Sequence, residues 1–145
     1  MNRARGFTLI EILVVLVIAG LMYALVPPLV GAGMAGAELK KAARQVAAGL
    51  RQTRSEALKR HKEASMVLDV DGRTFKIAEA TKVYQLPKRV DMKVLTAESE
   101  VVEQDAAIRF YPDGSSTGGR VTLAVGDKQF MVDVDWLTGR VTIVQ

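Results

Sequence analysis

A single carboxylate stands inside a long apolar run near the start of the chain. From residue 7 to residue 37 the sequence is apolar or small except at Thr8 and Glu11. An isolated carboxylate in an apolar environment is costly and either takes up a proton or needs a nearby cation. Glu11 is therefore a candidate for charge pairing. The alternative is a side chain that merely reaches the headgroup layer of a membrane.

The glycine-rich stretch from Asp113 to Gly119 is a second candidate, but its residue types do not fit a catalytic site. A phosphate-binding loop needs lysine followed by serine or threonine after its last glycine, whereas Arg120 is followed here by Val121. The serines lie outside a nucleophile-elbow pattern, and the single histidine, His61, is on a predicted helix. We therefore expect no enzymatic activity.

Two interpretations of this stretch remain open. Its glycines can adopt positive φ in a long hairpin loop that an aspartate begins, or the loop can dock onto a neighbouring subunit. The residues concerned are Asp113, Gly114, Ser115, Ser116, Thr117, Gly118 and Gly119.

Nothing in the sequence indicates a metal or cofactor site. The chain has no cysteine, which excludes disulfides, thiolate nucleophiles and cysteine-bound metals. Asp133 and Asp135 alternate with two valines on a predicted strand, so both should point to one solvated face. A compact oxygen-rich loop of the kind that calcium prefers is missing from the sequence.

Charge is segregated along the chain, whose net charge is +4. Residues 38–62 include eight basic and two acidic side chains, whereas residues 63–145 include ten basic and thirteen acidic ones. Clustered lysine and arginine can bind phosphate, but a DNA-binding head should expose such a cluster, and here the head is acidic. Nucleic acid is therefore not an expected partner.

One long helix is needed to position these residues. The apolar run 7–37 exceeds the roughly 20 residues that a helix needs to cross a bilayer, which predicts a transmembrane segment. An amphipathic continuation is predicted over residues 38–62, ending near Arg60. Its apolar face recurs at helical spacing and consists of Leu39, Ala43, Val46, Leu50, Ala57 and Leu58.

Short strands are predicted from residue 63 to residue 145. Ser65–Val70 and Arg73–Ala78 should form a hairpin with a primed two-residue turn at Asp71-Gly72. Further turns are expected at Gly126-Asp127 and Thr138-Gly139. The other predicted strands are Val83–Leu86, Val90–Leu95, Ala107–Tyr111, Val121–Val125, Gln129–Val134 and Val141–Val144.

These elements predict an α+β fold, with a long N-terminal helix packed on a small antiparallel β-rich head. Trp136 and Leu137 are expected in core or loop packing.

The N-terminal residues resemble the processing site of type IV pilins and type II secretion pseudopilins. The resemblance rests on Gly6-Phe7-Thr8-Leu9-Ile10-Glu11, with two arginines before it and an apolar run after it. It implies that a membrane prepilin peptidase removes the leader 1–6, cutting between Gly6 and Phe7, and methylates the new amino group of Phe7. It also implies that Glu11 pairs with a subunit's N-terminal amine during assembly and sets axial register.

A second resemblance narrows the family. The stretch Arg109-Phe110-Tyr111-Pro112-Asp113-Gly114-Ser115-Ser116-Thr117-Gly118-Gly119-Arg120-Val121 is similar to the signature region of the general secretion pathway protein H family, which are minor pseudopilins. This implies a type IV pilin-like subunit of a hetero-oligomeric tip complex, built with other major and minor pseudopilins on an inner-membrane platform, that helps to export folded proteins across the outer membrane. Because the tip-most subunit typically lacks the glutamate, Glu11 implies a position below the tip.

Two other functions stay open. The chain could be a minor pilin of a type IV pilus, acting in priming or DNA uptake, or a free-standing membrane-anchored binding protein that has no use for Glu11. The resemblance implies a single-pass protein of the bacterial inner membrane with its head in the periplasm. The charges alone leave the orientation open, because Lys40, Lys41 and Arg44 outweigh the two leader arginines.

Overall fold

The computed structural model describes the backbone of residues 7–77, 80–96, 101–102 and 105–145, and the side chains of these residues except 25–34 and 101–102. The chain forms two compact units, Met1–Met34 and Ala35–Gln145. Helix α1 (Leu9–Arg60) belongs to both. It ends at Arg60, as predicted, because His61 follows with a φ of 51°, a left-handed conformation that stops a helix.

The second half of α1 buries one apolar face. Its fully or almost fully buried residues are Leu39, Ala42, Ala43, Val46, Ala47, Leu50, Thr53 and Ala57. The hydroxyl of Thr53 donates to the Gly49 carbonyl oxygen at 2.9 Å, so this buried polar group is satisfied. Leu58, which the sequence analysis assigned to this face, is 38% exposed. The assignment was wrong because Leu58 lies at the edge of the buried face, about 100° around the helix from Leu39 and Ala57.

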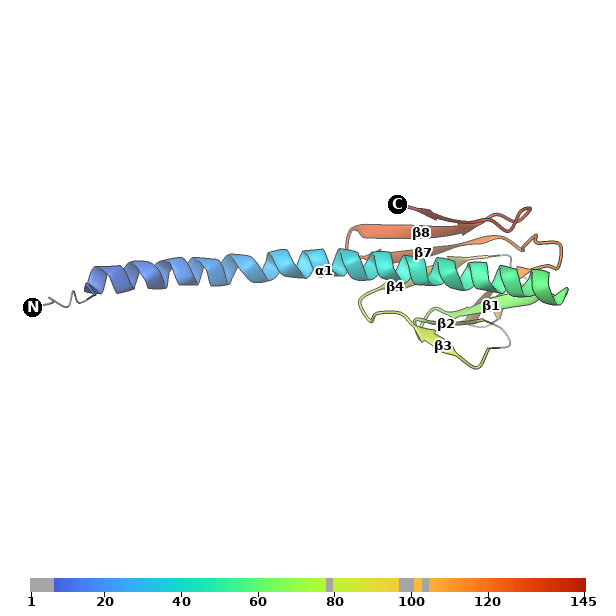
Figure 1. Cartoon of the computed structure of the whole chain (residues 1–145), viewed down its shortest axis with the longest axis horizontal. Helices are drawn as coiled ribbons and strands as arrows, with labels where there is room; N and C mark the ends of the chain where they lie inside the picture. The colour runs from blue at the N-terminus through green and yellow to red at the C-terminus, as the bar shows by residue number, and fades with distance from the viewer. Residues whose placement is uncertain (1–6, 78–79, 97–100, 103–104) are drawn as a thin grey trace, which may run out of the picture. The chain divides into compact units, whose positions relative to one another are not determined.

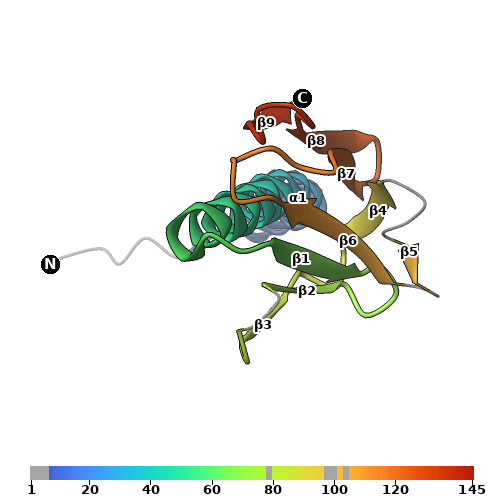
Figure 2. The same cartoon turned by 90° about the vertical axis from the view of Figure 1, so that its right-hand side faces the viewer.

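Two antiparallel sheets pack against one face of this half of the helix (Figures 1 and 2). Their strand orders, within the described residues, are β3-β2-β1-β6-β5 and β4-β7-β8-β9. The strands are β1 (Ala64–Asp69), β2 (Thr74–Ile77), β3 (Val83–Gln85), β4 (Asp91–Leu95), β5 (Val101–Val102), β6 (Asp105–Phe110), β7 (Gly119–Val125), β8 (Lys128–Val134) and β9 (Val141–Val144).

Alternation along the strands sends one set of side chains to a shared core. Met66 and Leu68 of β1 are fully buried, as are Val121 and Leu123 of β7, with their strand neighbours facing outward or half-exposed. Residues from α1 and from both sheets belong to a single hydrophobic cluster. Figure 2 shows α1 end-on, with β1 and β2 on one side and β7 to β9 on the other. The predicted helix-on-sheet packing is therefore confirmed.

The first hairpin is confirmed, but its turn is wrong. Asp69 pairs with Thr74, so residues 70–73 connect the strands instead of two residues. Arg73 adopts a φ of 52°, and the Asp69 carboxylate accepts a hydrogen bond from the Gly72 amide at 2.6 Å. An aspartate side chain that bonds the backbone a few residues on favours this wider loop. Residue 78, the predicted strand end, lies outside the described residues.

The second hairpin turn agrees with its prediction. Val125 pairs with Lys128, which leaves Gly126 and Asp127 as a two-residue connection. Gly126 has a φ of 58°, as the first central position of a primed turn requires. The short strand β5 was not predicted, because two residues carry no recognisable period.

In the part of the chain that the structure describes, no helical stretch combines the length and the hydropathy of a membrane crossing. The predicted transmembrane segment 7–37 includes residues 25–34, whose side chains lie outside the described set, and the predicted leader 1–6 lies wholly outside it. Both remain predictions.

Gly49 tests the packing between α1 and the first sheet. A Cβ at this position would lie 2.8 Å from the Phe75 ring, and that ring is buried and stacked on Tyr84. We expect Gly49→Ala to lower the free energy of unfolding by about 1–2 kcal/mol, because overpacking outweighs the gain in helix propensity.

Gly36→Ala is the matched control, since the added methyl would meet only the flexible Lys128 ammonium at 3.6 Å. It should be neutral or stabilise by up to about 1 kcal/mol. Denaturant unfolding of the full chain in detergent measures both, and equal changes in the two variants would contradict the packing described.

Candidate functional site

The first candidate site is the start of α1. Phe7 is 79% exposed and Leu9 is 84% exposed. The exposed large apolar side chains of this segment are Phe7, Leu9, Ile10, Ile12, Leu13, Val14, Val15, Leu16, Val17, Ile18, Leu21, Met22 and Tyr23. An apolar surface of this extent marks contact with a membrane or with other proteins. Gly6, on the other side of the predicted cleavage point, lies outside the described residues.

Glu11 occupies the first turn of this helix. The Thr8 hydroxyl oxygen accepts a hydrogen bond from the Glu11 amide at 3.3 Å, and the Thr8 carbonyl accepts one from the Ile12 amide at 3.3 Å. Thr8 is thus the N-cap, and Thr8 with Glu11 fits the S/T-x-x-E capping pattern. The sequence contains this signal, although the prediction considered Glu11 only as a pairing group or as a side chain that reaches the headgroup layer. A carboxylate here also interacts favourably with the helix dipole.

The second candidate site is the loop 111–118 between β6 and β7. Gly114 and Gly118 have φ values of 88° and 75°, which confirms that the glycines provide left-handed backbone. Gly119, with a φ of 147°, is already the first residue of β7, two residues before the predicted start. Gly114, Ser116 and Gly118 are buried, whereas Asp113 is exposed.

Both serine hydroxyls of the loop form hydrogen bonds within the loop or to the strand before it. The amide and hydroxyl of Ser115 donate to the Asp113 carboxylate at 2.9 and 2.6 Å, which begins the turn as predicted. These bonds, that of the hydroxyl foremost, hold the pKa of Asp113 below its ordinary value. The Ser116 hydroxyl donates to the Arg109 carbonyl at 2.7 Å and accepts from the Gly118 amide at 3.1 Å. The hydroxyls shape the backbone.

A contact between three elements fixes the far side of this loop. Arg54 of α1 donates through Nε to the Gly114 carbonyl oxygen at 3.2 Å. Gly139, in the loop 135–140 between β8 and β9, lies against the same carbonyl so closely that a Cβ there would overlap it. We call Arg54, Gly114 and Gly139 the loop clamp. Its partners are far apart in sequence, so no local signal predicted it.

The loop 135–140 is held by a second aspartate. The Asp135 carboxylate accepts hydrogen bonds from the Thr138 amide and hydroxyl, both at 2.8 Å. These bonds, the amide's first, lower the pKa of Asp135. Asp135 thus lies in the turn after β8, whereas Asp133, on the strand, bonds Arg120 through both carboxylate oxygens at 2.6 and 2.9 Å. Asp133 alone lies on the strand, so the expected strand face shared by the two aspartates does not form.

Trp136 and Leu137 differ from their prediction. Their side chains are 66% and 63% exposed, so neither belongs to the core. The backbone of Trp136 packs instead, since its carbonyl accepts the Ser116 amide at 2.8 Å and its Cβ would lie 3.0 Å from a Cβ on Gly118. The loop fixes the main chain and leaves both apolar side chains facing solvent.

The loop clamp predicts that a residue larger than glycine at position 139 destabilises the head. Gly139→Ala should lower the free energy of unfolding by roughly 2–4 kcal/mol, because the methyl adds a collision with the Gly114 carbonyl to the cost of a left-handed non-glycine residue. Gly126→Ala is the control, since its φ of 58° is similar but its surroundings are open. It should cost only about 1–2 kcal/mol. Equal losses in denaturant unfolding would argue against the clamp.

Comparison with known proteins gives two family matches. The model of the family described as Type II transport protein GspH matches residues 42–139, and that of the Prokaryotic N-terminal methylation motif matches residues 1–26. Type II secretion system protein H of Xanthomonas campestris pv. campestris is 33% identical over 141 residues, which cover 97% of this chain and 83% of that protein.

Solved structures share the fold at low identity. The minor pseudopilin EpsH from the Type 2 Secretion System of Vibrio cholerae aligns with a TM-score of 0.59 and 16% identity over 74% of this chain and 96% of that one. The type IV minor pilin FimU of Pseudomonas aeruginosa aligns with a TM-score of 0.59 and 18% identity over 74% and 89%. These likenesses confirm the predicted pilin-like α+β fold. The family matches and the 33% identical relative identify the family. The chain belongs to the GspH family of type II secretion minor pseudopilins, which are membrane-anchored structural subunits that assemble with other pseudopilins.

Proposed function

We propose that this chain is processed between Gly6 and Phe7, is anchored as a single-pass protein in the bacterial inner membrane, and assembles below the tip of the secretion pseudopilus with its head in the periplasm. The observation that carries the proposal is the capped Glu11 in the first turn of α1, in a segment where the exposed large side chains from Phe7 to Tyr23 are apolar.

Cleavage at that point would create a cation close to this carboxylate. The amine of Phe7 would precede the N-cap Thr8 by one residue and Glu11 by four. In an apolar filament core, an amine of one subunit and a carboxylate of the next would neutralise each other, and leaving either alone would be strongly unfavourable. Because the cap fixes Glu11 near the helix start, the pair can set the axial register between subunits.

The partners follow from this role. We infer that a prepilin peptidase removes residues 1–6 and methylates Phe7, and that an inner-membrane assembly platform inserts the subunit among major and minor pseudopilins. A catalytic role is not part of the proposal, because the loop serines are engaged in shaping the backbone. Nucleic acid and cofactors have no part in it.

The signature loop has a narrower role in this proposal than the sequence suggested. Of its residues, Gly114, Ser116 and Gly118 are buried in the head, and Asp113 is exposed. A neighbouring subunit would therefore touch the loop mainly at Asp113, with the glycines and Ser116 holding the surface in shape.

Type IV pilus function is the less supported alternative. The likeness to FimU is at 18% identity, which is evidence of fold alone, whereas the family match and the 33% identical relative both belong to type II secretion. In the described part of the head, no feature favours the pilus assignment over the secretion assignment.

Processing gives the direct test of the N-terminus. Protein purified from membranes should begin with methylated Phe7 when prepilin peptidase is present and keep Met1 when it is absent, as read by intact mass and N-terminal analysis. A chain that keeps Met1 in both strains, or that is cut elsewhere, would refute the filament proposal.

Glu11 variants test the pairing. Glu11→Gln keeps the size of the side chain, and Glu11→Leu makes it as apolar as its neighbours. Both variants should stay in the membrane but should co-purify with other pseudopilins at least about tenfold less. The reason is that the Phe7 amine would be left as an unpaired buried charge, which costs about 3–5 kcal/mol. Secretion of folded substrates should fall as co-purification falls.

Glu38→Ala removes a carboxylate from the same helix outside the apolar segment and serves as the control, with normal co-purification expected. Normal assembly of both Glu11 variants would instead favour a free-standing membrane-anchored protein.

A further inference from the structure

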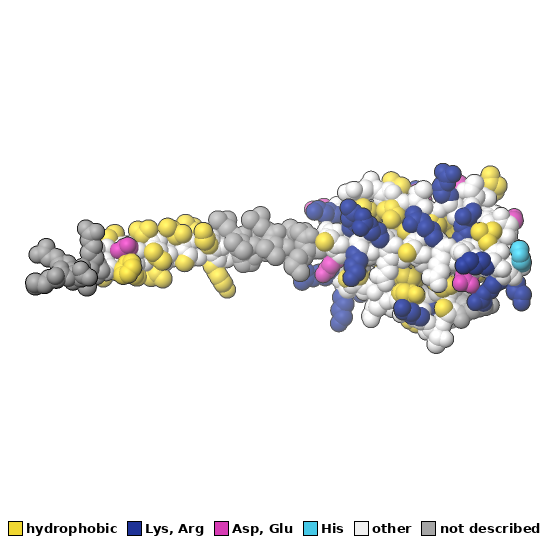
Figure 3. Space-filling view, viewed as in Figure 1, with side chains coloured by type: hydrophobic (Ala, Val, Ile, Leu, Met, Phe, Trp, Pro, Cys, Tyr) yellow, Lys and Arg dark blue, Asp and Glu magenta, His cyan; other side chains and the backbone are white. Residues whose placement is uncertain are grey.

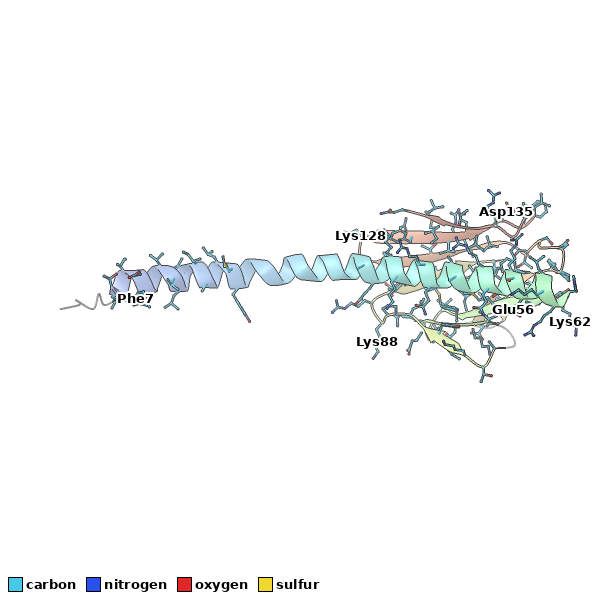
Figure 4. All side chains as sticks on the ribbon, in the orientation of Figure 1. Phe7, Glu56, Lys62, Lys88, Lys128 and Asp135 are labelled. Atoms are coloured by element: carbon cyan, nitrogen blue, oxygen red, sulfur yellow. The ribbon has the colours of Figure 1, made fainter. Side chains whose placement is uncertain are left out.

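Six exposed basic side chains gather at one end of the second unit. Three lie on α1, two on the connection between β3 and β4, and one at the start of β8. They are Lys40, Lys41, Arg44, Lys88, Arg89 and Lys128, and we call them the basic collar. In Figure 4 the labelled Lys88 and Lys128 lie at the same end of the strands, and Lys62 lies at the opposite end. Basic side chains are visible at this end, and also elsewhere on the head, in the space-filling view (Figure 3).

Contacts between the elements make the collar one surface. Lys128 extends toward α1 so that its Nζ lies 3.6 Å from the place of a Cβ on Gly36. Lys41 and Lys88 line the same groove, of about 460 Å³, between the helix and the connection that precedes β4. Side chains separated by as many as 88 positions in sequence therefore share one end of the head.

The charge of this surface is largely uncompensated. Glu38 and Asp127 are the acidic residues in the collar's own segments, and Asp91, two residues after Arg89, pairs with Arg73 at 3.5 Å. Together with the six collar cations, these residues leave four positive charges in excess. Asp69, Asp71 and Asp105 lie around the β1–β2 turn of the first sheet. In the described part of the chain none of the six collar side chains forms an ion pair, whereas Arg120 is paired with Asp133 at 2.6 Å. A net positive field therefore extends from the collar itself.

The position of the collar relative to the membrane follows from the proposed anchoring, on which this inference rests. Residues 9–37 of a helix rise about 43 Å at 1.5 Å per residue. A bilayer with its headgroups is roughly 40–45 Å thick. The first basic residues after this segment, Lys40 and Lys41, would therefore leave the membrane at its outer headgroup layer, together with the loops beside them.

We propose that the basic collar binds the anionic phospholipid headgroups on the periplasmic face of the inner membrane, and so docks the head there before the subunit enters the filament. The residue types favour this occupant over a protein. Four of the six are lysines, which are depleted from protein interfaces, and among the described residues of the collar's segments no exposed aromatic side chain accompanies them. Flexible ammonium groups suit mobile headgroups, which demand no fixed geometry.

The absence of cysteine makes a site-specific test simple. Gln129→Cys, exposed beside Lys128, carries a donor fluorophore on the full mature chain in lipid nanodiscs that contain an acceptor-labelled phospholipid. Energy transfer should be higher with one-third phosphatidylglycerol than with phosphatidylcholine alone, and salt should abolish the difference. The triple variant Lys88→Gln, Arg89→Gln, Lys128→Gln should weaken docking about 100-fold, from the contribution expected of each basic residue near an anionic surface.

A matched triple variant, Lys59→Gln, Lys62→Gln, Lys76→Gln, removes the same charge from exposed positions outside the collar and should dock normally. Equal energy transfer in both lipids, or an equal loss in the two triple variants, would overturn the collar while leaving the filament proposal intact. So would normal docking of the collar variant with impaired secretion, which would indicate an acidic partner subunit instead. Failure of the chain to co-elute with nanodiscs would overturn the anchoring, and the collar with it.

Discussion

Burial of one apolar face of α1 between two sheets holds the second unit together. In the described part of the chain, neither sheet has a second layer of its own, and the buried residues of α1 from Leu39 to Ala57 share one hydrophobic cluster with both sheets. A glycine sets the distance between α1 and the first sheet. Gly49 lets the Phe75 ring approach the helix backbone, and Phe75 in turn stacks on Tyr84 with ring centroids 5.0 Å apart. The core thus extends from the helix along one face of the first sheet to its edge strand β3.

The loops at the end of this helix depend on the same packing. Arg54 reaches the Gly114 carbonyl only because the buried residues around it fix the rotation of α1. That carbonyl in turn lies against Gly139, so the two loops are joined through the helix. The stretch that marks the family in the sequence therefore has a structural explanation. Its glycines and serines close a contact between elements that are distant along the chain, and they need no ligand.

The sequence predicted what local pattern controls. Helical spacing located the buried face of α1, and Gly126 with Asp127 located a tight turn, because each signal lies within a few residues. Prediction from the sequence failed where a side-chain hydrogen bond changes the local backbone, or where contacts between distant residues determine the structure. Asp69 widened the first hairpin, and a two-residue strand was too short to recognise. Trp136 and Leu137 were expected in core or loop packing, but the loop holds the Trp136 main chain and leaves both side chains exposed. Arg54 and Gly139 carried no signal, since their partner is more than 20 residues away.

The two proposed charge interactions act on different states of the same subunit. Glu11 gains its partner only among packed subunits, in apolar surroundings where an ion pair is hardly screened. The basic collar gains its partner at a wet lipid surface, where attraction declines within about 8 Å at physiological salt. A contact of that kind is strong when several charges act together and is lost once the head has moved a short distance. The collar can therefore hold a waiting head in place without opposing its later entry into a filament, whose stability depends on the less screened pair.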